Sequence, residues 1–158
     1  SDVCSSDLSR RAAHHDLRAE MPESLLMARM DARLMVQVLV NLLDNAVKYT
    51  PEGTAISVRA LADGQWVRLE VADNGPGICE QEQAGIFDMF HSAAIKKGDG
   101  RRGMGLGLAL CRSIVQAHGG QIEVHANLPQ GAIFSLALPQ MQTGASALKP
   151  FPEPAKYW

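Results

Sequence analysis

The sequence predicts an α+β fold, in which an antiparallel-rich sheet carries helices on one face. Two observations predict this class. Two segments carry apolar residues at helical spacing, and two pairs of alternating apolar segments are joined by turn residues, as in β-hairpins. A chain of 158 residues, 46% of them hydrophobic, has the size of one domain that buries a core without disulfides or metals.

The bulk properties argue against several classes of protein. The net charge of −2 gives no general attraction to nucleic acid or to a membrane surface, so we expect neither as a partner of this segment. The cysteines Cys4, Cys79 and Cys111 are odd in number and widely spaced, which argues against a disulfide framework and a zinc site and fits a reducing cytosol. No run approaches the ~18 apolar residues that span a bilayer, and no signal peptide is recognisable. We therefore expect a cytoplasmic segment, with any membrane part of a parent protein outside this chain.

The start of the chain is expected to be irregular and then to form strands. Residues 1–16 lack an apolar period, as in a disordered start or a cloning scar. A first strand is expected over Leu17–Met21, and Leu25–Met30 is expected to pair with it after a turn at Pro22-Glu23-Ser24.

A long amphipathic helix is predicted over Ala32 to Tyr49. Asp31 is its expected N-cap, because a carboxylate there can accept hydrogen bonds from free backbone amides, and Thr50-Pro51-Glu52-Gly53 ends it. A wide apolar stripe predicts burial of one face, formed by Leu34, Val38, Leu39, Leu42, Leu43, Ala46 and Val47.

A hairpin is predicted next, joined through Ala62-Asp63-Gly64. Its two strands alternate apolar residues on one face, which are Ile56, Val58 and Ala60 in one and Val67, Leu69 and Val71 in the other. Arg68 and Glu70 fall on the opposite face, so that face is either wet or packs polar groups.

A second helix and a second hairpin are predicted in the second half of the chain, which shows no internal repeat. After a short apolar turn or helix at residues 86–90 and a polar loop at 91–102, a second helix is predicted over Leu106 to His118, ended by Gly119-Gly120. Gln121–Ala126 and Ala132–Leu138 form the last predicted hairpin. The domain is then expected to cover residues 17–139, followed by a flexible, proline-containing tail at 140–158.

Three polar residues of the first helix could hold phosphates and a metal ion. Asn41, Asn45 and Lys48 are spaced i, i+4, i+7, which places them within about 60° of one another around the helix. The amide oxygen of Asn is a hard ligand suited to Mg²⁺, Lys48 would add a point charge beside phosphates, and Tyr49 could lie over a base. The alternative is that the strip is only the solvent face of an amphipathic helix.

A second candidate feature follows the first hairpin, at Asp73-Asn-Gly75-Pro-Gly77. A carboxylate at the end of a strand can accept a hydrogen bond from an exocyclic amine, which selects adenine over guanine, and the glycines allow close approach of the backbone. The alternative is a tight turn that happens to contain Asp.

A third candidate feature, Gly103-Met-Gly105-Leu-Gly107-Leu, opens the second helix, where free amides and the helix dipole favour an anion. A dinucleotide fingerprint is disfavoured because the third glycine comes one residue early, and no Gly-Lys-Ser/Thr run of a P-loop occurs. The glycines could also serve only as a hinge. The preceding loop carries four cations that would either reach phosphates or remain a solvated cluster, namely Lys96, Lys97, Arg101 and Arg102.

The histidines and cysteines are not expected to carry chemistry. His15-Asp-Leu-Arg18 looks like the start of a phosphoaccepting motif, but it lies 30 residues before Asn45, which leaves no room for the two long helices such a motif needs. His91, His118 and His125 are isolated and are expected at the surface or at caps. Cys79 and Cys111 are expected to be structural or incidental thiols.

Taken in order, these segments resemble the catalytic, ATP-binding domain of bacterial sensor histidine kinases, within the gyrase, Hsp90, histidine kinase and MutL superfamily. The resemblance covers residues 17–139 and rests on five motifs. These are the N box at 41–51, the first glycine box at 73–77, the F box at 86–90, the second glycine box at 103–108, and the closing Gly-Gly and Gly-x-x-Phe elements at 119–134. Within the family, IFDMF, GLGLALCRSIVQAHGG and GAIFSLALPQ look most like the Kdp-type potassium-responsive sensor kinases.

The resemblance implies a Bergerat-type two-layer sandwich, a flexible lid at 91–103 and an Mg–ATP site. It implies that Asn45 binds Mg²⁺, that Asn41 and Lys48 act on the phosphates, and that Tyr49 and Asp73 contact adenine. The other implied ATP-binding residues are Gly75, Gly77, Ile78, Arg101, Arg102, Gly103, Gly105, Leu106, Gly107 and Leu108. The implied partners are a histidine-containing dimerisation domain, missing from this chain, and a response regulator, and the implied parent is a homodimeric membrane sensor.

The superfamily contains kinases and hydrolases, and the residue at position 41 favours a kinase. ATPase members resemble one another in placing a Glu one turn before the metal-binding Asn, where it activates water as a general base. This chain has Asn41 there, which cannot take up a proton, whereas transfer to a histidine needs no such base. Asp44, next to Asn45, could assist. A serine-directed anti-sigma kinase and a nucleotide-binding module without transfer activity are the alternatives.

Overall fold

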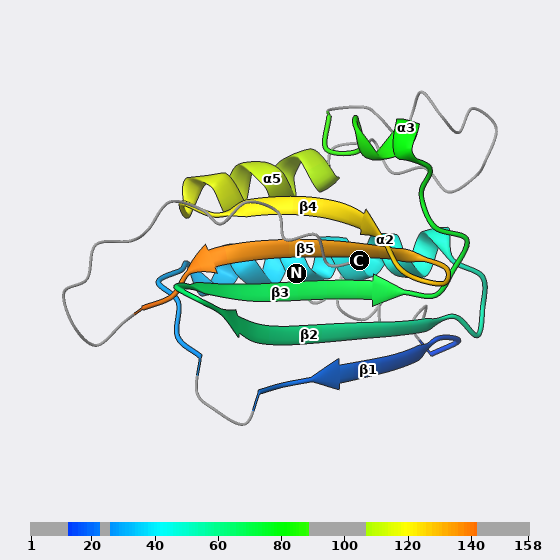
Figure 1. Cartoon of the computed structure of the whole chain (residues 1–158), viewed down its shortest axis with the longest axis horizontal. Coiled ribbons are helices and arrows are strands. Elements are labelled where there is room, and N and C mark those ends of the chain that lie inside the picture. The colour runs from blue at the N-terminus through cyan, green and yellow to red at the C-terminus, as the bar shows by residue number, and fades with distance from the viewer. Residues whose placement is uncertain (1–12, 23–25, 89–106, 142–158) are drawn as a thin grey trace.

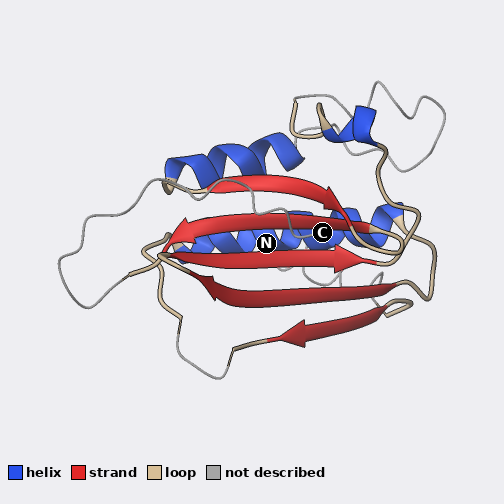
Figure 2. Ribbon diagram, in the orientation of Figure 1, coloured by secondary structure: helices blue, strands red, loops and turns tan. Residues whose placement is uncertain are grey.

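The computed structural model describes residues 13–22, 26–88 and 107–141. Its five strands form one sheet in the order β1-β2-β3-β5-β4, with α2 and α5 packed together on one face (Figures 1 and 2). The elements are β1 (Asp16–Glu20), α2 (Ala32–Tyr49), β2 (Ala55–Asp63), β3 (Trp66–Asp73), α3 (Glu80–Gln83), α5 (Gly107–Ala117), β4 (Gln121–Ala126) and β5 (Ala132–Pro139). The predicted α+β class, with a mostly antiparallel sheet and helices on one face, is confirmed.

The predicted pairing of the first strand is wrong. β1 pairs in parallel with β2, from Asp16 opposite Ala55 to Glu20 opposite Arg59, and not with residues 26–30, the described part of its predicted partner. All five residues of β1 are exposed, so its sequence carried no alternation that could identify a partner. The partner is set instead by α2, which crosses over between the two strands and returns the chain to the edge of the sheet in the same direction (Figure 1).

The segment between β1 and α2 lies against the far end of β5. Ala28 forms an isolated antiparallel bridge with Gln140, and the amide of Met141 donates to the carbonyl of Met27 at 2.7 Å. Gln140 and Met141, which the sequence placed in the tail, are therefore tied to this segment.

The long helix has the predicted bounds and cap. Oδ1 of Asp31 accepts from the amides of Arg33 at 3.0 Å and Leu34 at 3.2 Å. The predicted inward stripe was wrong at its start, because Leu34 is 41% exposed and Met35 is only 3% exposed. The residues that face the sheet recur every three or four positions from there, at Met35, Val38, Leu42, Ala46 and Val47.

The core lies between the two helices and the inner face of the sheet. Both predicted hairpins are confirmed: Val58 lies opposite Val71 in the first, and Val124 lies opposite Phe134 in the second. Phe87 adds an edge-to-face contact with Phe134 at a centroid distance of 6.2 Å, which anchors the segment after α3. The short helix α3 was not predicted, because it buries no residue and so leaves no apolar pattern.

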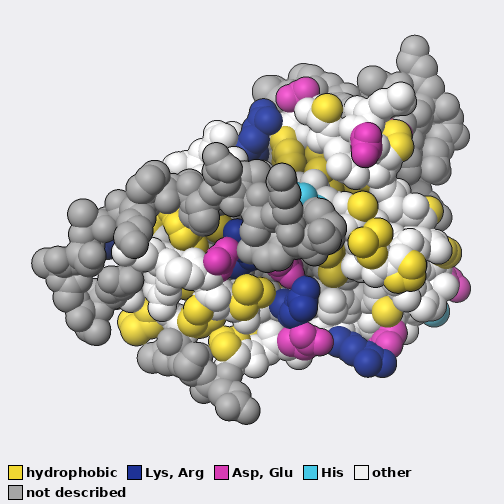
Figure 3. Space-filling view, in the orientation of Figure 1, with side chains coloured by type: hydrophobic (Ala, Val, Ile, Leu, Met, Phe, Trp, Pro, Cys, Tyr) yellow, Lys and Arg dark blue, Asp and Glu magenta, His cyan; other side chains and the backbone are white. Residues whose placement is uncertain are grey.

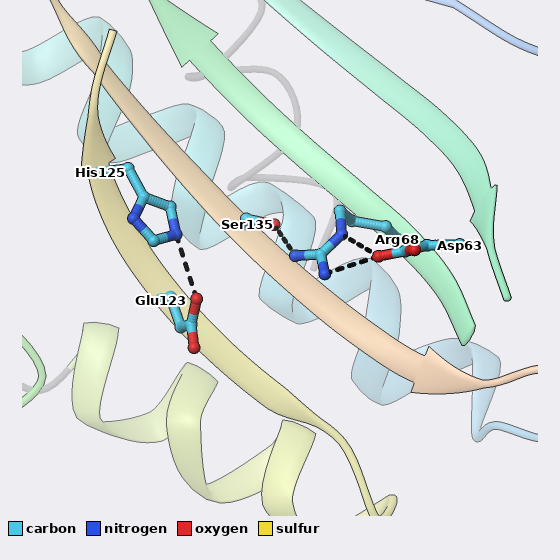
Figure 4. Close-up of polar contacts among 5 residues, drawn as sticks. All are labelled: Asp63, Arg68, Glu123, His125 and Ser135. Carbon is cyan, nitrogen blue, oxygen red and sulfur yellow. Dashed lines mark hydrogen bonds and ion pairs between the residues drawn. The ribbon is translucent and has the colours of Figure 1, made fainter. Parts of the chain in front are cut away.

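The outer face of the sheet packs polar groups, which was one of the two alternatives for Arg68 and Glu70. The Arg68 side chain is 3% exposed, and it donates to Oδ2 of Asp63 at 2.8 and 3.1 Å and to Oγ of Ser135 at 2.9 Å (Figure 4). Glu70 accepts from Arg59 at 2.8 Å. Basic and acidic side chains lie side by side on the face seen in Figure 3. This face is therefore held by complementary charges between neighbouring strands.

Two histidines that were expected to be isolated have partners. His118 bonds the carbonyl of Ile114 through Nδ1 at 2.7 Å, so Nδ1 carries the proton and Nε2 accepts from the amide of Asp31 at 3.0 Å. It thus joins the end of α5 to the start of α2, as a cap. On β4, Nε2 of His125 lies 3.1 Å from Oε2 of Glu123 (Figure 4).

Candidate functional site

The candidate site lies at one end of the sheet. The ends of α2, β3 and β4 and the starts of α5 and β5 all lie at the same end of the domain (Figure 1). This arrangement brings the end of the long helix, the first glycine turn and the turn before β5 into one region, although they are separated by up to half of the chain.

Asp73, the last residue of β3, is fixed there by backbone amides. Its Oδ1 accepts from Gly75 at 2.9 Å and from Ala132 at 3.4 Å, and its carbonyl accepts from Nδ2 of Asn127 at 2.8 Å. No hydrogen bond from a described residue engages Oδ2. Among the described residues, the protein therefore holds Asp73 through one of its two carboxylate oxygens.

Burial changes the acidity of this carboxyl. Asp73 is 7% exposed, and desolvation raises its pKa above its ordinary value, while the hydrogen bonds from Gly75 and Ala132 lower it in part. A carboxylate kept buried at the end of a strand at this cost is typical of a functional position.

The glycines around Asp73 allow segments of backbone to approach closely. Gly131 has a φ of +117°, and a Cβ atom there would collide with the carbonyl of Asp73. Gly77 has a φ of +81°, and its Cβ would lie 3.0 Å from the carbonyl oxygen of Gly131. A Cβ at Gly75 would lie 2.6 Å from Cγ2 of Thr50. Glycine is therefore required at these positions by the packing of the site.

The polar strip of α2 lies at the border of the core, and none of its three members is fully exposed. Oδ1 of Asn41 accepts from Gln37 at 3.1 Å, and its side chain also bonds the thiol of Cys111 on α5. Lys48 forms an ion pair with Asp44 at 2.7 Å, one turn back. The side chain of Asn45 has no hydrogen bond to another described residue. The strip is therefore a half-buried row rather than a solvated face.

The structure describes some of the other predicted ATP-binding residues. Tyr49 is half-buried, and Ile78 and Leu108 are partly buried against the core. Gly107 begins α5, and a Cβ atom there would meet no described residue within 4 Å. Five predicted ATP-binding residues lie outside the described part of the chain, namely Arg101, Arg102, Gly103, Gly105 and Leu106.

The described residues contain no cluster of acidic, histidine or cysteine side chains of the kind that holds a metal ion. Among residues 13–22, 26–88 and 107–141, no group of three or more His, Cys, Asp or Glu could hold one. No helix in the same ranges is long and apolar enough to cross a membrane.

Sequence reasoning missed three residues that build the site. Asn127 holds the carbonyl of Asp73, and Thr50 packs on Gly75 and contacts His15 at 3.0 Å. These contacts join segments 25 to 54 residues apart, so no local pattern could have predicted them.

Residues 30–142 match the family described as histidine kinase-, DNA gyrase B- and HSP90-like ATPase. The chain is 42% identical over 132 residues to the sensor protein KdpD of Clostridium acetobutylicum, which covers 84% of this chain and 15% of that protein. It is 44% identical over 124 residues to the adaptive-response sensory kinase SasA of Gloeothece citriformis, which covers 78% of this chain and 31% of that protein. The chain thus spans less than a third of the length of these relatives.

Solved structures agree with this assignment. The mycobacterial sensor histidine kinase MprB has a TM-score of 0.72 at 28% identity, covering 88% of this chain and 92% of that chain. Full-length ShkA in complex with AMPPNP has a TM-score of 0.73 at 31% identity, covering 91% of this chain and 30% of that chain. The chain belongs to the histidine kinase-, DNA gyrase B- and HSP90-like ATPase family, and within it is an ATP-binding catalytic domain of the sensor histidine kinase type.

Proposed function

We propose that this domain binds Mg–ATP and transfers the γ-phosphate to a histidine on a separate dimerisation domain. The observation that carries the proposal is the buried carboxylate of Asp73, with Oδ1 held by the amide of Gly75 at 2.9 Å and Oδ2 left without a bond from any described residue. The parent protein would sense the stimulus, and a response regulator, as a separate partner, would take up the phosphate from the histidine.

Asp73 selects adenine by the polarity of its hydrogen bond. Adenine presents an exocyclic amine, a donor, where guanine presents O6, an acceptor. An ionised carboxylate only accepts, so it binds the amine and repels O6. Because the charged partner is shielded from water, the contact is worth about 1.5–3 kcal/mol, which corresponds to roughly 10–150-fold in affinity.

Asn45 binds the Mg²⁺ that accompanies the phosphates. Its amide oxygen is a hard ligand. The residue is half-buried, and its side chain forms no hydrogen bond with another described residue. Lys48, Asn41 and the second glycine segment, with Arg101 and Arg102, contact the phosphates. Bound Mg²⁺ would neutralise charge on the β- and γ-phosphates, and this chain's residues would orient them.

The residue one turn before the proposed metal ligand favours transfer of the γ-phosphate to histidine over hydrolysis of ATP by water. Asn41 lies one turn before Asn45, and its amide is engaged by Gln37 and by the Cys111 thiol. An amide cannot take a proton from water, so hydrolysis lacks a base at this position. The nearby acid, Asp44, is paired with Lys48 at 2.7 Å. A histidine acceptor is already a nucleophile and needs no such base.

The parent protein is proposed to be a homodimeric membrane sensor that contains the phosphoacceptor domain. Similarity to KdpD at 42% identity supports a potassium-responsive parent, and similarity to SasA at 44% identity supports an adaptive-response kinase equally well. The parent is therefore proposed to be a sensor kinase, without a choice between these two types.

Nucleotide titration tests the ATP site. We expect Asn45→Ala to weaken ATP binding in Mg²⁺ at least ~10-fold and to leave Mg²⁺-free binding within about twofold, because only the metal-assisted part is lost. Gln116→Ala, which removes an exposed amide from α5, is the matched control and should change neither value. Equal affinity of Asn45→Ala and wild type in Mg²⁺ would remove the metal role.

Mixing the domain with Mg–ATP and a separately made dimerisation domain of a sensor kinase tests the transfer. Acid-labile phosphate on histidine supports the kinase. ATP binding with neither transfer nor hydrolysis supports the non-catalytic module, and acid-stable phosphate on serine supports the serine-directed kinase.

A further inference from the structure

We propose that His15 is a positioning residue for the adenine pocket, acting through Thr50 and Gly75 on Asp73. The inference rests on the proposed role of Asp73 in binding adenine. It gives a function to the one histidine motif of the sequence, His15-Asp-Leu-Arg18, that the kinase chemistry does not use.

The first contact in this chain joins His15 to Thr50. Nε2 of His15 lies 3.0 Å from Oγ1 of Thr50, and that hydroxyl also donates to the carbonyl of Ala46. A hydroxyl has one proton, so once it is given to Ala46 the oxygen can only accept from His15. Nε2 of His15 therefore carries the proton, and the Thr50 side chain is held in one rotamer from both sides.

The second contact joins Thr50 to the glycine turn. Thr50 is 6% exposed, and its Cγ2 lies so close to Gly75 that a Cβ there would be 2.6 Å away. The amide of Gly75 donates to Oδ1 of Asp73 at 2.9 Å. The methyl group of Thr50 thus packs against Gly75, whose amide orients the carboxylate, and we expect a change of the Thr50 rotamer to remove that support.

The backbone of the same segment strengthens the link. The carbonyl of His14 accepts from the amide of Gly53 at 2.7 Å, and the amide of Asp16 donates to Thr54 at 3.1 Å. The two neighbours of His15 in the sequence are therefore hydrogen-bonded to the turn that follows α2, next to the contact between His15 and Thr50.

The two ring nitrogens of His15 differ in their surroundings. Nδ1 is buried and has no hydrogen-bond partner in the part of the chain that the structure describes. A buried acceptor without a partner is costly, and such a group in a folded protein calls for an explanation. Because Nε2 carries the proton that it donates to Thr50, Nδ1 is the acceptor nitrogen, and the contact with Thr50 orients the ring.

A pair of nucleotides distinguishes positioning of Asp73 from a general loss of structure. ATP carries the 6-amino group that Asp73 would accept from, and purine riboside triphosphate lacks it. The dissociation constants of both are measured for wild type, His15→Ala, Thr50→Val, the double variant and Asp73→Asn. Thr50→Val keeps a methyl group on Gly75 and removes the hydroxyl that bonds His15.

We expect His15→Ala to weaken ATP binding about 3–10-fold. Its affinity for purine riboside triphosphate should stay within about twofold of the wild-type value. Thr50→Val should do the same, and the double variant should be no weaker than either single variant, because both break one link. His15→Gln, which can donate from its own Nε2, should restore ATP affinity to within about twofold of wild type.

Equal losses for the two nucleotides, or no loss for ATP, would overturn the role of His15. The control separates this failure from failure of the adenine site. If Asp73→Asn does not reduce the preference for ATP over purine riboside triphosphate, the role of Asp73 itself is wrong and the inference falls with it. Denaturant unfolding of each variant establishes that it is folded, and His15→Gln provides a folded variant where His15→Ala is unstable.

Discussion

Gly131 lies against Asp73 so closely that a Cβ atom at position 131 would collide with the carbonyl oxygen of Asp73. The contact joins the turn before β5 to the end of β3, and the next residue, Ala132, donates its amide to Oδ1 of the same aspartate at 3.4 Å. The carboxylate of Asp73 is thus positioned by the backbone of the last hairpin as well as by its own turn.

This contact predicts that Gly131→Ala destabilises the domain by at least ~1–3 kcal/mol, because both the positive φ of +117° and the collision oppose a side chain. Denaturant unfolding measures the loss. Gly64→Ala is the matched control: Gly64 also has a positive φ, of +62°, but a Cβ there meets nothing within 4 Å, so only the backbone cost of ~1 kcal/mol is expected. Equal costs at the two positions would show that the Asp73 contact is unimportant for folding.

The elements that the sequence predicted well are those with local signals. The helix α2 is preceded by a capping carboxylate at Asp31 and followed by a turn at Thr50, and the first hairpin follows from alternation that places Val58 opposite Val71. Each of these signals lies within a few residues of the element that it specifies, because caps and turns act on neighbouring backbone groups.

The parts that could not be predicted depend on contacts between distant segments. β1 has five exposed residues and pairs with β2 only because α2 brings the chain back to that edge. Asp73 could be singled out from its place after a strand, but its support by Asn127 and Gly131 comes from the last hairpin, more than 50 residues away. Sequence spacing holds no information on such backbone packing.

Asp73→Asn should stabilise the domain without nucleotide at neutral pH. Burial raises the pKa of Asp73 above its ordinary value of 3.8, so below that value the carboxyl is neutral in the folded and unfolded states and no penalty applies. As the pH rises through the raised folded-state pKa, the folded state bears the cost of a buried charge. The advantage of the Asn variant in the free energy of unfolding should therefore be largest near pH 7 and vanish toward pH 3.5. Denaturant titrations across this range test it, and a pH-independent difference would contradict it.

Arg68 should contribute more to stability than an exposed arginine. Its side chain is 3% exposed and bonds Asp63 twice, whereas Arg18 is 73% exposed in its pair with Asp16. We expect Arg68→Met to cost about 2–3 kcal/mol, below the full cost of breaking a buried pair because Asp63, 32% exposed, remains hydrated. Arg18→Met, the control, should cost under ~1 kcal/mol. Chemical unfolding that gives similar costs for the two would show that the outer-face network is not stabilising.

Cys111 should be chemically inert in the folded domain. It is fully buried, its thiol lies 3.7 Å from the carbonyl of Val38, and burial raises its pKa to about 11. At pH 8 only about one such thiol in 1,000 is ionised, so alkylation should label the exposed Cys79 at least ~100-fold faster. Peptide mass spectrometry after timed alkylation measures both rates, and a sample in denaturant should label both alike. Comparable rates in the folded domain would contradict the buried packing of α5 on α2.

The fate of the γ-phosphate is the most direct test of the kinase assignment. Labelled ATP with Mg²⁺ is incubated with the domain, with and without a sensor kinase dimerisation domain, and free phosphate and acid-labile phosphohistidine are followed over time. We predict transfer to histidine when the acceptor is present and release of free phosphate at least ~100-fold slower when it is absent, since Asn41 supplies no base for water. Rapid release of free phosphate without an acceptor would contradict the account, because it would place a water-activating base in a site where Asn41 stands.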